Sequence, residues 1–255
     1  MKQREIILDM GKAAFVVLAV KVMASTSLLI PWNPTVDNLC IVFALAVLLV
    51  KLCTITLTLG KLIGLAAVSL AVLYSCVSIG QYDLLISLIA VCLLINEDID
   101  EYISMLLRTQ IYILAAHIVL ATMLSLTGSD HLYWSITDSR LRFNGGFAHA
   151  NVLSSYITSC MLMFAWTHFR EITKNQWGWM SAVTVLSYGL SRSRTGLMLN
   201  ILLLVLVYLA QKDNRLLRSF IKPVLLLSFP ALAAFVYWVT QQYLNNNGLA
   251  VFVDD

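Results

Sequence analysis

Residues 139–156 read SRLRFNGGFAHANVLSSY and concentrate polar and basic side chains at the start of a long apolar run. A second stretch, SRSRTG at residues 191–196, precedes another apolar run. We call residues 140–151 the first arginine cluster and residues 191–196 the second arginine cluster. Only 12% of the chain is charged and 60% is hydrophobic, so two such clusters indicate a specific task. The polar residues of the first cluster are Arg140, Arg142, Asn144, His149 and Asn151.

The composition is typical of a membrane protein. A soluble domain carries roughly a quarter charged and about half apolar residues. This chain has half that share of charge and long apolar runs, which are typical of helices in a bilayer. Its net charge of +3 is too small to indicate nucleic-acid binding. The five cysteines lie singly in apolar runs, without the spacing of a zinc site or a disulfide framework.

About nine apolar runs are expected to form helices, because a spanning helix needs about 20 mostly apolar residues. The runs at 83–95 and 177–190 are short, and runs of this length are also typical of re-entrant segments. No internal repeat or linker divides the chain, so residues 1–255 are expected to form one domain. The predicted fold is therefore all-α, a polytopic integral membrane helix bundle of about nine transmembrane helices. The runs are residues 12–30, 39–57, 62–79, 83–95, 107–126, 147–167, 177–190, 195–210 and 224–243.

The distribution of basic residues predicts a cytoplasmic N-terminus. Cytoplasmic segments of membrane proteins carry an excess of Lys and Arg. The N-terminal residues MKQREIILDMGK mix both charge signs, which favours a first membrane helix over a cleaved signal peptide. The outer segments then contain only four basic residues, all of them in the two arginine clusters: Arg140, Arg142, Arg192 and Arg194. The inner segments contain Lys2, Arg4, Lys12, Lys51, Lys61, Arg108, Arg170, Lys174, Lys212, Arg215, Arg218 and Lys222.

The two outer loops, at about 127–150 and 190–196, are suited to binding an oligophosphate. Both following helices begin at the outer face, and helix N-termini attract anions through their dipoles and unpaired backbone N–H groups. Arginine binds phosphate or carboxylate through two parallel hydrogen bonds. Gly145 and Gly146 make the backbone approachable, and Ser193 or Thr195 can cap the second helix. The alternative is that the arginines only reach lipid head groups as interfacial anchors.

His149 is the candidate general base, since an imidazole can accept a proton near neutral pH. Asp130 and Asp138, in the same outer loop, are alternative bases or arginine partners. His117 is interpreted as a hydrogen-bonded core residue, and His131 as a solvated loop residue.

The sequence RLRFNGGFAHAN before one span and LSRSRTG before a later one resemble the oligosaccharide-repeat polymerase and O-antigen ligase superfamily. Members share an Arg-rich, Gly-containing stretch that ends in a His/Asn–Pro–Asn-like element, and a later Ser-Arg-Ser/Gly element before a helix. Ala150 stands where proline is commoner. The matching residues are Arg140, Arg142, Gly146, His149, Asn151, Ser191, Arg192, Ser193, Arg194 and Gly196.

The resemblance implies glycan transfer from a polyprenyl (undecaprenyl) pyrophosphate to an acceptor hydroxyl, outside the cytoplasmic membrane. It implies polymerisation or ligation in surface, capsular or exopolysaccharide synthesis, with other polysaccharide-assembly membrane proteins as partners. His149, Arg142 and Arg194 would be the catalytic residues. Family members usually continue into a further outer loop and helices, so the resemblance implies a C-terminally shortened member. Residues that would bind the pyrophosphate or glycan are Arg140, Asn144, Gly146, Asn151, Arg192 and Ser193.

No cofactor or metal is expected, because the outer loops contain no Asp-x-Asp-like pair and guanidinium groups can stabilise a leaving pyrophosphate. One alternative function is a transporter or flippase of an anionic or lipid-linked substrate. Transporters usually carry ionisable sites near the midplane and repeated halves. Here the runs offer mainly Lys21, which either has a function, or snorkels or is paired within the bundle. The other alternative is a non-catalytic membrane subunit.

Overall fold

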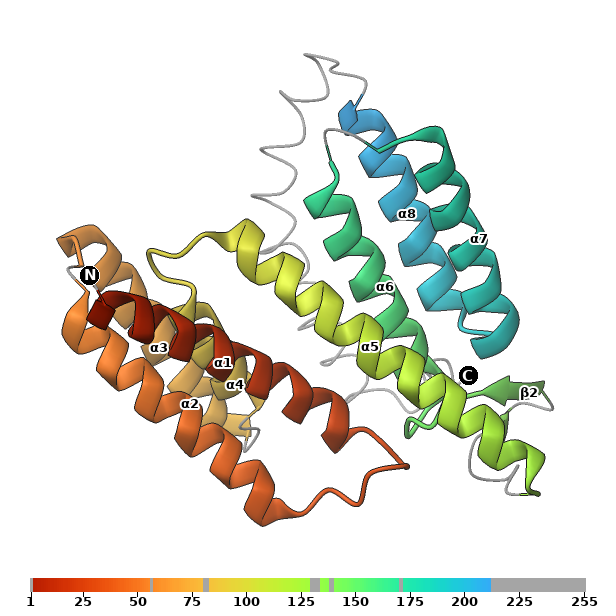
Figure 1. Ribbon diagram of the computed structural model, residues 1–255, viewed down its shortest axis with the longest axis horizontal. Helices are drawn as coiled ribbons and strands as arrows, with labels where there is room; N and C mark the ends of the chain where they lie inside the picture. The colour runs from red at the N-terminus through yellow and green to blue at the C-terminus, as the bar shows by residue number, and fades with distance from the viewer. Residues whose placement is uncertain are drawn as a thin grey trace, which may run out of the picture.

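The computed structural model describes residues 2–55, 57–79, 83–128, 134–137, 140–169 and 172–211. These residues form eight helices and one two-stranded antiparallel hairpin (Figure 1). The helices are α1 (Lys2–Ser25), α2 (Pro34–Thr54), α3 (Leu59–Ile79), α4 (Asp83–Leu93), α5 (Ile99–Leu126), α6 (Ala150–Thr167), α7 (Lys174–Ser191) and α8 (Arg194–Gln211). The strands are β1 (Trp134–Thr137) and β2 (Arg140–Phe143).

The prediction of a helical protein is confirmed, but the expected count of about nine spans is not met. Two helices in the described part of the chain, α2 and α5, are long and apolar enough to cross a membrane. Shorter apolar stretches lie in α3 (Leu62–Tyr74) and α8 (Arg194–Leu209). Helix α4 has only 11 residues, and α1 includes the charged N-terminal segment that was expected to precede the first span. The ninth run, at 224–243, lies outside the described residues.

A two-stranded β-hairpin accompanies the helices, within a fold that is all-α as expected. In the sequence WSIT and then RLRF, apolar and polar residues alternate, which is the pattern of a strand. The register pairs Trp134 with Phe143 and Thr137 with Arg140. The hairpin lies within the expected outer loop at about 127–150, and its strand β2 contains Arg140 and Arg142 of the first arginine cluster.

The helices form two groups with separate hydrophobic cores, joined by α5. Helices α1, α2 and α4 pack together in the N-terminal group, with α3 against α4, while α6, α7 and α8 pack together in the C-terminal group (Figure 1). Helix α5 contacts α1 on one side and α6 on the other. The first core contains Ala14, Leu18, Ala44, Val47, Leu48, Ile86, Ile89, Cys92 and Leu93. The second contains Met23, Ala121, Phe143, Phe147, Leu153, Ile157, Met161, Ala165, Met180 and Val207.

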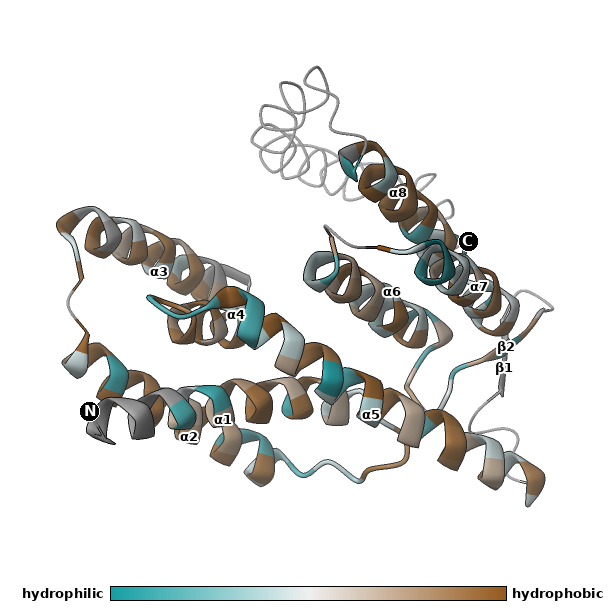
Figure 2. Cartoon of the chain, turned by 45° about the horizontal axis from the view of Figure 1, so that its top comes forward, coloured by the Kyte–Doolittle hydropathy of each residue, from teal (hydrophilic) through white to brown (hydrophobic). Residues whose placement is uncertain are grey.

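Large apolar side chains cover much of the outside of both groups. Val77 is 82% exposed and Leu126 is 84% exposed. In the apolar windows of α2 and α5, only 22% and 11% of the residues are buried inside the protein. The hydrophobic colouring of α3 and α8 continues over most of their length (Figure 2). A core helix of a soluble protein would be mostly buried. Helices α2 and α5 instead expose most of their apolar surface.

Lys12 and Lys51 of the N-terminal group are paired with carboxylates. Lys12 pairs with Glu101, and Lys51, which is 1% exposed, pairs with Glu97 at 2.6 Å. Lys51 also donates a hydrogen bond to the carbonyl of Leu93. Lys51, which the distribution of basic residues assigned to an inner segment, is therefore buried within the bundle.

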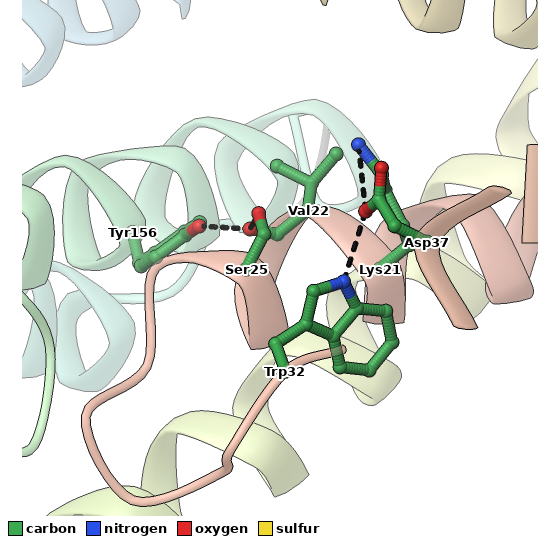
Figure 3. A network of polar contacts seen from close by, with 6 residues as sticks. All are labelled: Lys21, Val22, Ser25, Trp32, Asp37 and Tyr156. Carbon is green, nitrogen blue, oxygen red and sulfur yellow. Dashed lines mark hydrogen bonds and ion pairs between the residues drawn. The ribbon is translucent and has the colours of Figure 1, made fainter. Parts of the chain in front are cut away.

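Lys21, the ionisable residue inside the first apolar run, is also paired. Its Nζ lies 3.2 Å from Oδ1 of Asp37 on α2, and that oxygen accepts a hydrogen bond of 2.9 Å from the indole of Trp32 (Figure 3). Of the two interpretations of Lys21, pairing within the bundle is the one that the structure supports.

Candidate functional site

The first arginine cluster contains a tight turn that only glycine can form without strain. Gly145 and Gly146 have φ angles of +62° and +84°, in the region that L-amino acids rarely adopt. A Cβ on Gly146 would lie 2.6 Å from the Leu29 side chain, so a larger residue would also collide with its neighbour. The Asn144 side-chain carbonyl accepts a hydrogen bond of 3.1 Å from the Gly146 N–H, and its backbone carbonyl accepts one from Phe147. We call residues 144–147 the glycine turn.

The connection between α1 and α2 holds the glycine turn in place. The Leu28 N–H donates to the Gly146 carbonyl at 2.7 Å, and the Ala148 N–H donates to the Thr26 carbonyl at 2.9 Å. These two bonds form an isolated antiparallel bridge between Ser27 and Phe147. Two segments about 120 residues apart in sequence are therefore held together by backbone hydrogen bonds of the antiparallel type.

Tyr156 of α6 strengthens the same connection. Its hydroxyl lies 3.0 Å from the hydroxyl of Thr26. It also donates a hydrogen bond of 3.2 Å to the Val22 carbonyl (Figure 3). The helix that follows the first cluster is thus tied to the end of α1.

His149 and Asn151 stand exposed at the start of α6. His149 is the N-cap residue, but its imidazole makes no capping hydrogen bond. Its carbonyl accepts the first hydrogen bond of the helix, from Val152 at 3.0 Å. The imidazole is therefore presented to the surroundings beside the unpaired N–H groups and the positive dipole end of α6. This placement agrees with the position expected for a candidate base.

The second arginine cluster is a tight connection between α7 and α8. Arg192 caps α7 in the left-handed conformation, with φ of +52° and its N–H bonded to the Tyr188 carbonyl at 2.8 Å. Ser193 caps α8, because its hydroxyl accepts a hydrogen bond of 3.2 Å from the Gly196 N–H. Of the two predicted capping residues, the structure selects Ser193. Ser191 is fully buried and accepts a bond from the Ser193 N–H.

Gly196 brings the two clusters together. A Cβ at this position would lie 1.8 Å from the Ser154 hydroxyl of α6, so α8 approaches α6 closely only because residue 196 lacks a side chain. Strand β2 contacts α7 as well. The starts of α6 and α8 and the hairpin consequently lie at the same end of the C-terminal group (Figure 1).

The arginines occupy different environments at this end. Arg192 and Arg194 are exposed and form no ion pair with any residue that the structure describes. Arg142 is half-buried in β2, opposite Ser135. Arg140 is the first residue of the same strand. An arginine at a helix N-terminus is electrostatically unfavourable alone, and becomes favourable when an anion binds there.

Asn144, Gly146 and Ser193 were predicted to bind substrate, but polar groups of all three form hydrogen bonds within the protein. The side-chain carbonyl of Asn144 and the N–H of Gly146 bond to each other, and the Ser193 hydroxyl caps α8. Asn144 and Ser193 are each 4% exposed. The side chains of His149, Asn151, Arg192, Arg194 and Thr195 are exposed to a ligand, and that of Arg142 is partly exposed. The alternative bases Asp130 and Asp138, and the loop residue His131, lie outside the described residues.

Sequence reasoning missed a layer of buried polar residues beneath this end. Ser154, Ser187 and Asn200 are buried on α6, α7 and α8, with side-chain atoms that have no hydrogen-bond partner among the described residues. Asn200 lies four residues after Gly196, on the same face of α8. A single asparagine within an apolar helix was the available signal. Sequence reasoning also missed Ser27, whose hydroxyl lies 2.8 Å from Nε2 of His117.

No group of three or more His, Cys, Asp or Glu side chains suited to a metal ion occurs in the described ranges. Metal independence stays a prediction from the outer-loop sequence. Comparison with known proteins found no match, whether to a protein-family model, to a curated protein or to a solved structure. The function must therefore be argued from the site and from the motif resemblance.

Proposed function

We propose that this chain is a multi-pass protein of the cytoplasmic membrane that polymerises or ligates polyprenyl-pyrophosphate-linked oligosaccharide repeat units at the outer face. The single observation that carries the proposal is the close approach of α8 to α6 at Gly196. We infer that this approach brings the exposed residues Arg192, Arg194 and His149 near two helix N-termini, where an oligophosphate would bind favourably.

The surface of the bundle supports the membrane part of the proposal. Helices α2 and α5 are long, apolar and mostly exposed, which suits lipid contact. We propose that their neighbours cross the bilayer with them, because α1 packs against both. Paired lysines in the N-terminal group also suit a bilayer, where an unpaired buried charge is costly.

In the proposed reaction, the acceptor hydroxyl attacks the anomeric carbon of the lipid-linked glycan. The bond between that carbon and the pyrophosphate oxygen breaks, and the pyrophosphate leaves on the polyprenyl carrier. Arg142, Arg192 and Arg194 stabilise the charge that develops on the leaving group, and His149 accepts the proton of the acceptor. The arginines supply the positive charge that a metal would otherwise supply, so activity is expected to persist in EDTA.

The test is the length distribution of surface polysaccharide in cells that lack the gene and carry a complementing copy. Wild type is expected to restore long chains, while Arg194→Ala and Arg142→Lys leave single repeat units or short chains. The lysine variant is informative because it keeps the charge and loses the two-pronged geometry of the guanidinium group. Lys174→Ala, at the opposite end of α7, is the control and is expected to behave as wild type. Unchanged chains in every strain would favour a transporter or a non-catalytic subunit and remove the enzyme interpretation.

A further inference from the structure

His117 lies in α5 and contacts both residues of the bridge, Ser27 and Phe147. It is 4% exposed. Its Nδ1 lies 2.9 Å from the Ile113 carbonyl, and its Nε2 lies 2.8 Å from the Ser27 hydroxyl. Its ring stacks on Phe147, with a centroid distance of 4.6 Å and an interplanar angle of 7°. The core histidine expected from the sequence is confirmed, but its partners belong to the bridge that holds the first arginine cluster.

The hydrogen-bond pattern defines the direction of each bond. The Ile113 carbonyl can only accept, so Nδ1 carries the imidazole hydrogen. The Ser27 oxygen already accepts hydrogen bonds from the Leu29 N–H at 3.0 Å and the Ile30 N–H at 3.2 Å. Its own hydrogen is then donated to Nε2. A neutral imidazole satisfies both partners, and Ser27 is fixed by all three bonds.

Both sides of the bridge are therefore held by one side chain. His117 bonds to Ser27 and stacks on Phe147, and these two residues form the antiparallel bridge between the α1–α2 connection and the glycine turn. Phe147 is completely buried and lies two residues before His149. The glycine turn also follows β2, which contains Arg142. A shift of the bridge would move both groups.

We propose that His117 and Ser27 are positioning residues that fix the glycine turn, and thereby set where Arg142 and His149 are presented. This role rests on the proposed function, because it matters only if those two residues act on a substrate. Neither positioning residue touches the ligand. An apolar side chain would fill the space of His117, but it would leave the Ser27 hydroxyl without its acceptor and the bridge without its link to α5.

The geometry of the bridge is measured by a disulfide between Thr26→Cys and Ala148→Cys, which flank the bridged pair. Paired residues of antiparallel strands have Cα atoms about 5.5 Å apart, within the range for a disulfide. Linked peptides are quantified by mass spectrometry after mild oxidation. We expect the cross-link to form readily in the parent chain, and to form at least fivefold less in His117→Phe and in Ser27→Ala. His117→Phe keeps an aromatic ring against Phe147 and removes both hydrogen bonds.

Two matched variants control for general damage. Ser27→Thr keeps the hydroxyl and is expected to restore the cross-link and the chain length. Thr122→Ala removes an exposed hydroxyl of α5 that donates to the carbonyl of Ile118 in its own helix, and is expected to change neither. Protein levels in the membrane are compared by immunoblot, so that chain length is read per molecule. Ser27→Ala removes one oxygen atom and provides a milder test than His117→Phe if that variant accumulates poorly.

The outcomes separate this role from the proposed function. We expect cross-linking and polysaccharide chain length to fall together in His117→Phe and Ser27→Ala. Unchanged cross-linking in both variants would overturn the proposal. Reduced cross-linking with full chain length, while Arg194→Ala gives short chains, would overturn the positioning role and leave the proposed function standing. Full chain length in Arg194→Ala itself would remove the proposed function, and the positioning role with it, whatever the cross-linking shows.

Discussion

The N-terminal and C-terminal helix groups use their basic residues in opposite ways. Lys21 and Lys51 of the N-terminal group are buried and paired with carboxylates. Arg192 and Arg194 of the C-terminal group are exposed and have no ion pair among the described residues. A buried, paired cation contributes to the fold, because breaking the pair leaves a charge without compensation. An exposed cation at a helix N-terminus adds nothing to the fold and is suited to an incoming anion.

The two groups also differ in how their helices begin. In the N-terminal group, α2 begins with a capping asparagine and a proline, an ordinary helix start. In the C-terminal group, α6 and α8 begin after positive-φ residues, and their approach requires Gly196. We interpret the difference as a division of roles. The C-terminal group presents two helix starts close together, and the N-terminal group contributes to the stability of the fold. The following predictions test that division.

The largest effect on stability is expected for Lys51→Met in the N-terminal group. The substitution leaves Glu97 in a mostly buried position without its partner, which typically costs about 3–5 kcal/mol of the free energy of unfolding. The double variant Lys51→Met/Glu97→Gln is expected to recover much of that loss. Thermal unfolding of the purified protein in detergent measures both. A single variant as stable as wild type would mean that the ion pair does not hold the group together.

A smaller loss, of about 2–4 kcal/mol, is expected for Gly146→Ala in the glycine turn. The variant suffers from the positive φ angle and from the contact with Leu29. Gly64→Ala is the matched control, since a Cβ there meets no atom within 4 Å, and alanine favours a helix. Unfolding midpoints in detergent are compared. Equal midpoints for both variants would contradict the strained geometry of the turn.

A loss of about 1–3 kcal/mol is expected for Gly196→Ala, because α8 must move away from Ser154. Gly189→Ala in α7 is the control, as a Cβ there meets nothing within 4 Å. The polysaccharide in complemented cells is expected to be short for Gly196→Ala and normal for Gly189→Ala. Long chains with Gly196→Ala would show that the close approach of the two helix starts is not needed.

The smallest effect on stability is expected for Arg194→Ala, within about 0.5 kcal/mol, which is usual for an exposed residue without partners. The unfolding midpoint in detergent checks this value. The same variant is expected to abolish long polysaccharide chains. A large loss of stability would place Arg194 with the structural lysines and remove the contrast between the two groups.

The sequence predicted the helices well, because their apolar runs are long and bounded by polar residues. It also identified the two arginine clusters, whose role as a binding site stays a prediction. It missed the hairpin, because the alternation in residues 134–143 lies inside a loop between two strong helical signals. It overestimated the spans, because an apolar run alone does not fix how long the helix is. The start of α1 was missed for the related reason that charged residues also form helices.

Roles within the site were harder to predict than its location. Asn144 and Ser193 are polar residues in an arginine-rich motif, yet their side chains are used to form a turn and a cap. A sequence does not show whether a polar group is already bonded within the protein. The contact between Ser27 and His117 joins residues 90 positions apart, and no local pattern predicts it.

The most direct test of the account is the effect of pyrophosphate on the unfolding midpoint of the purified protein in detergent. A ligand that binds the folded state raises the midpoint, by an amount that grows with the logarithm of the ligand concentration above its Kd. The variants are the double substitution Arg192→Gln/Arg194→Gln and the control Lys174→Gln. We predict that pyrophosphate stabilises wild type and the control, and does not stabilise the double variant. Equal stabilisation of all three proteins, or none in wild type, would contradict an anion site at the start of α8.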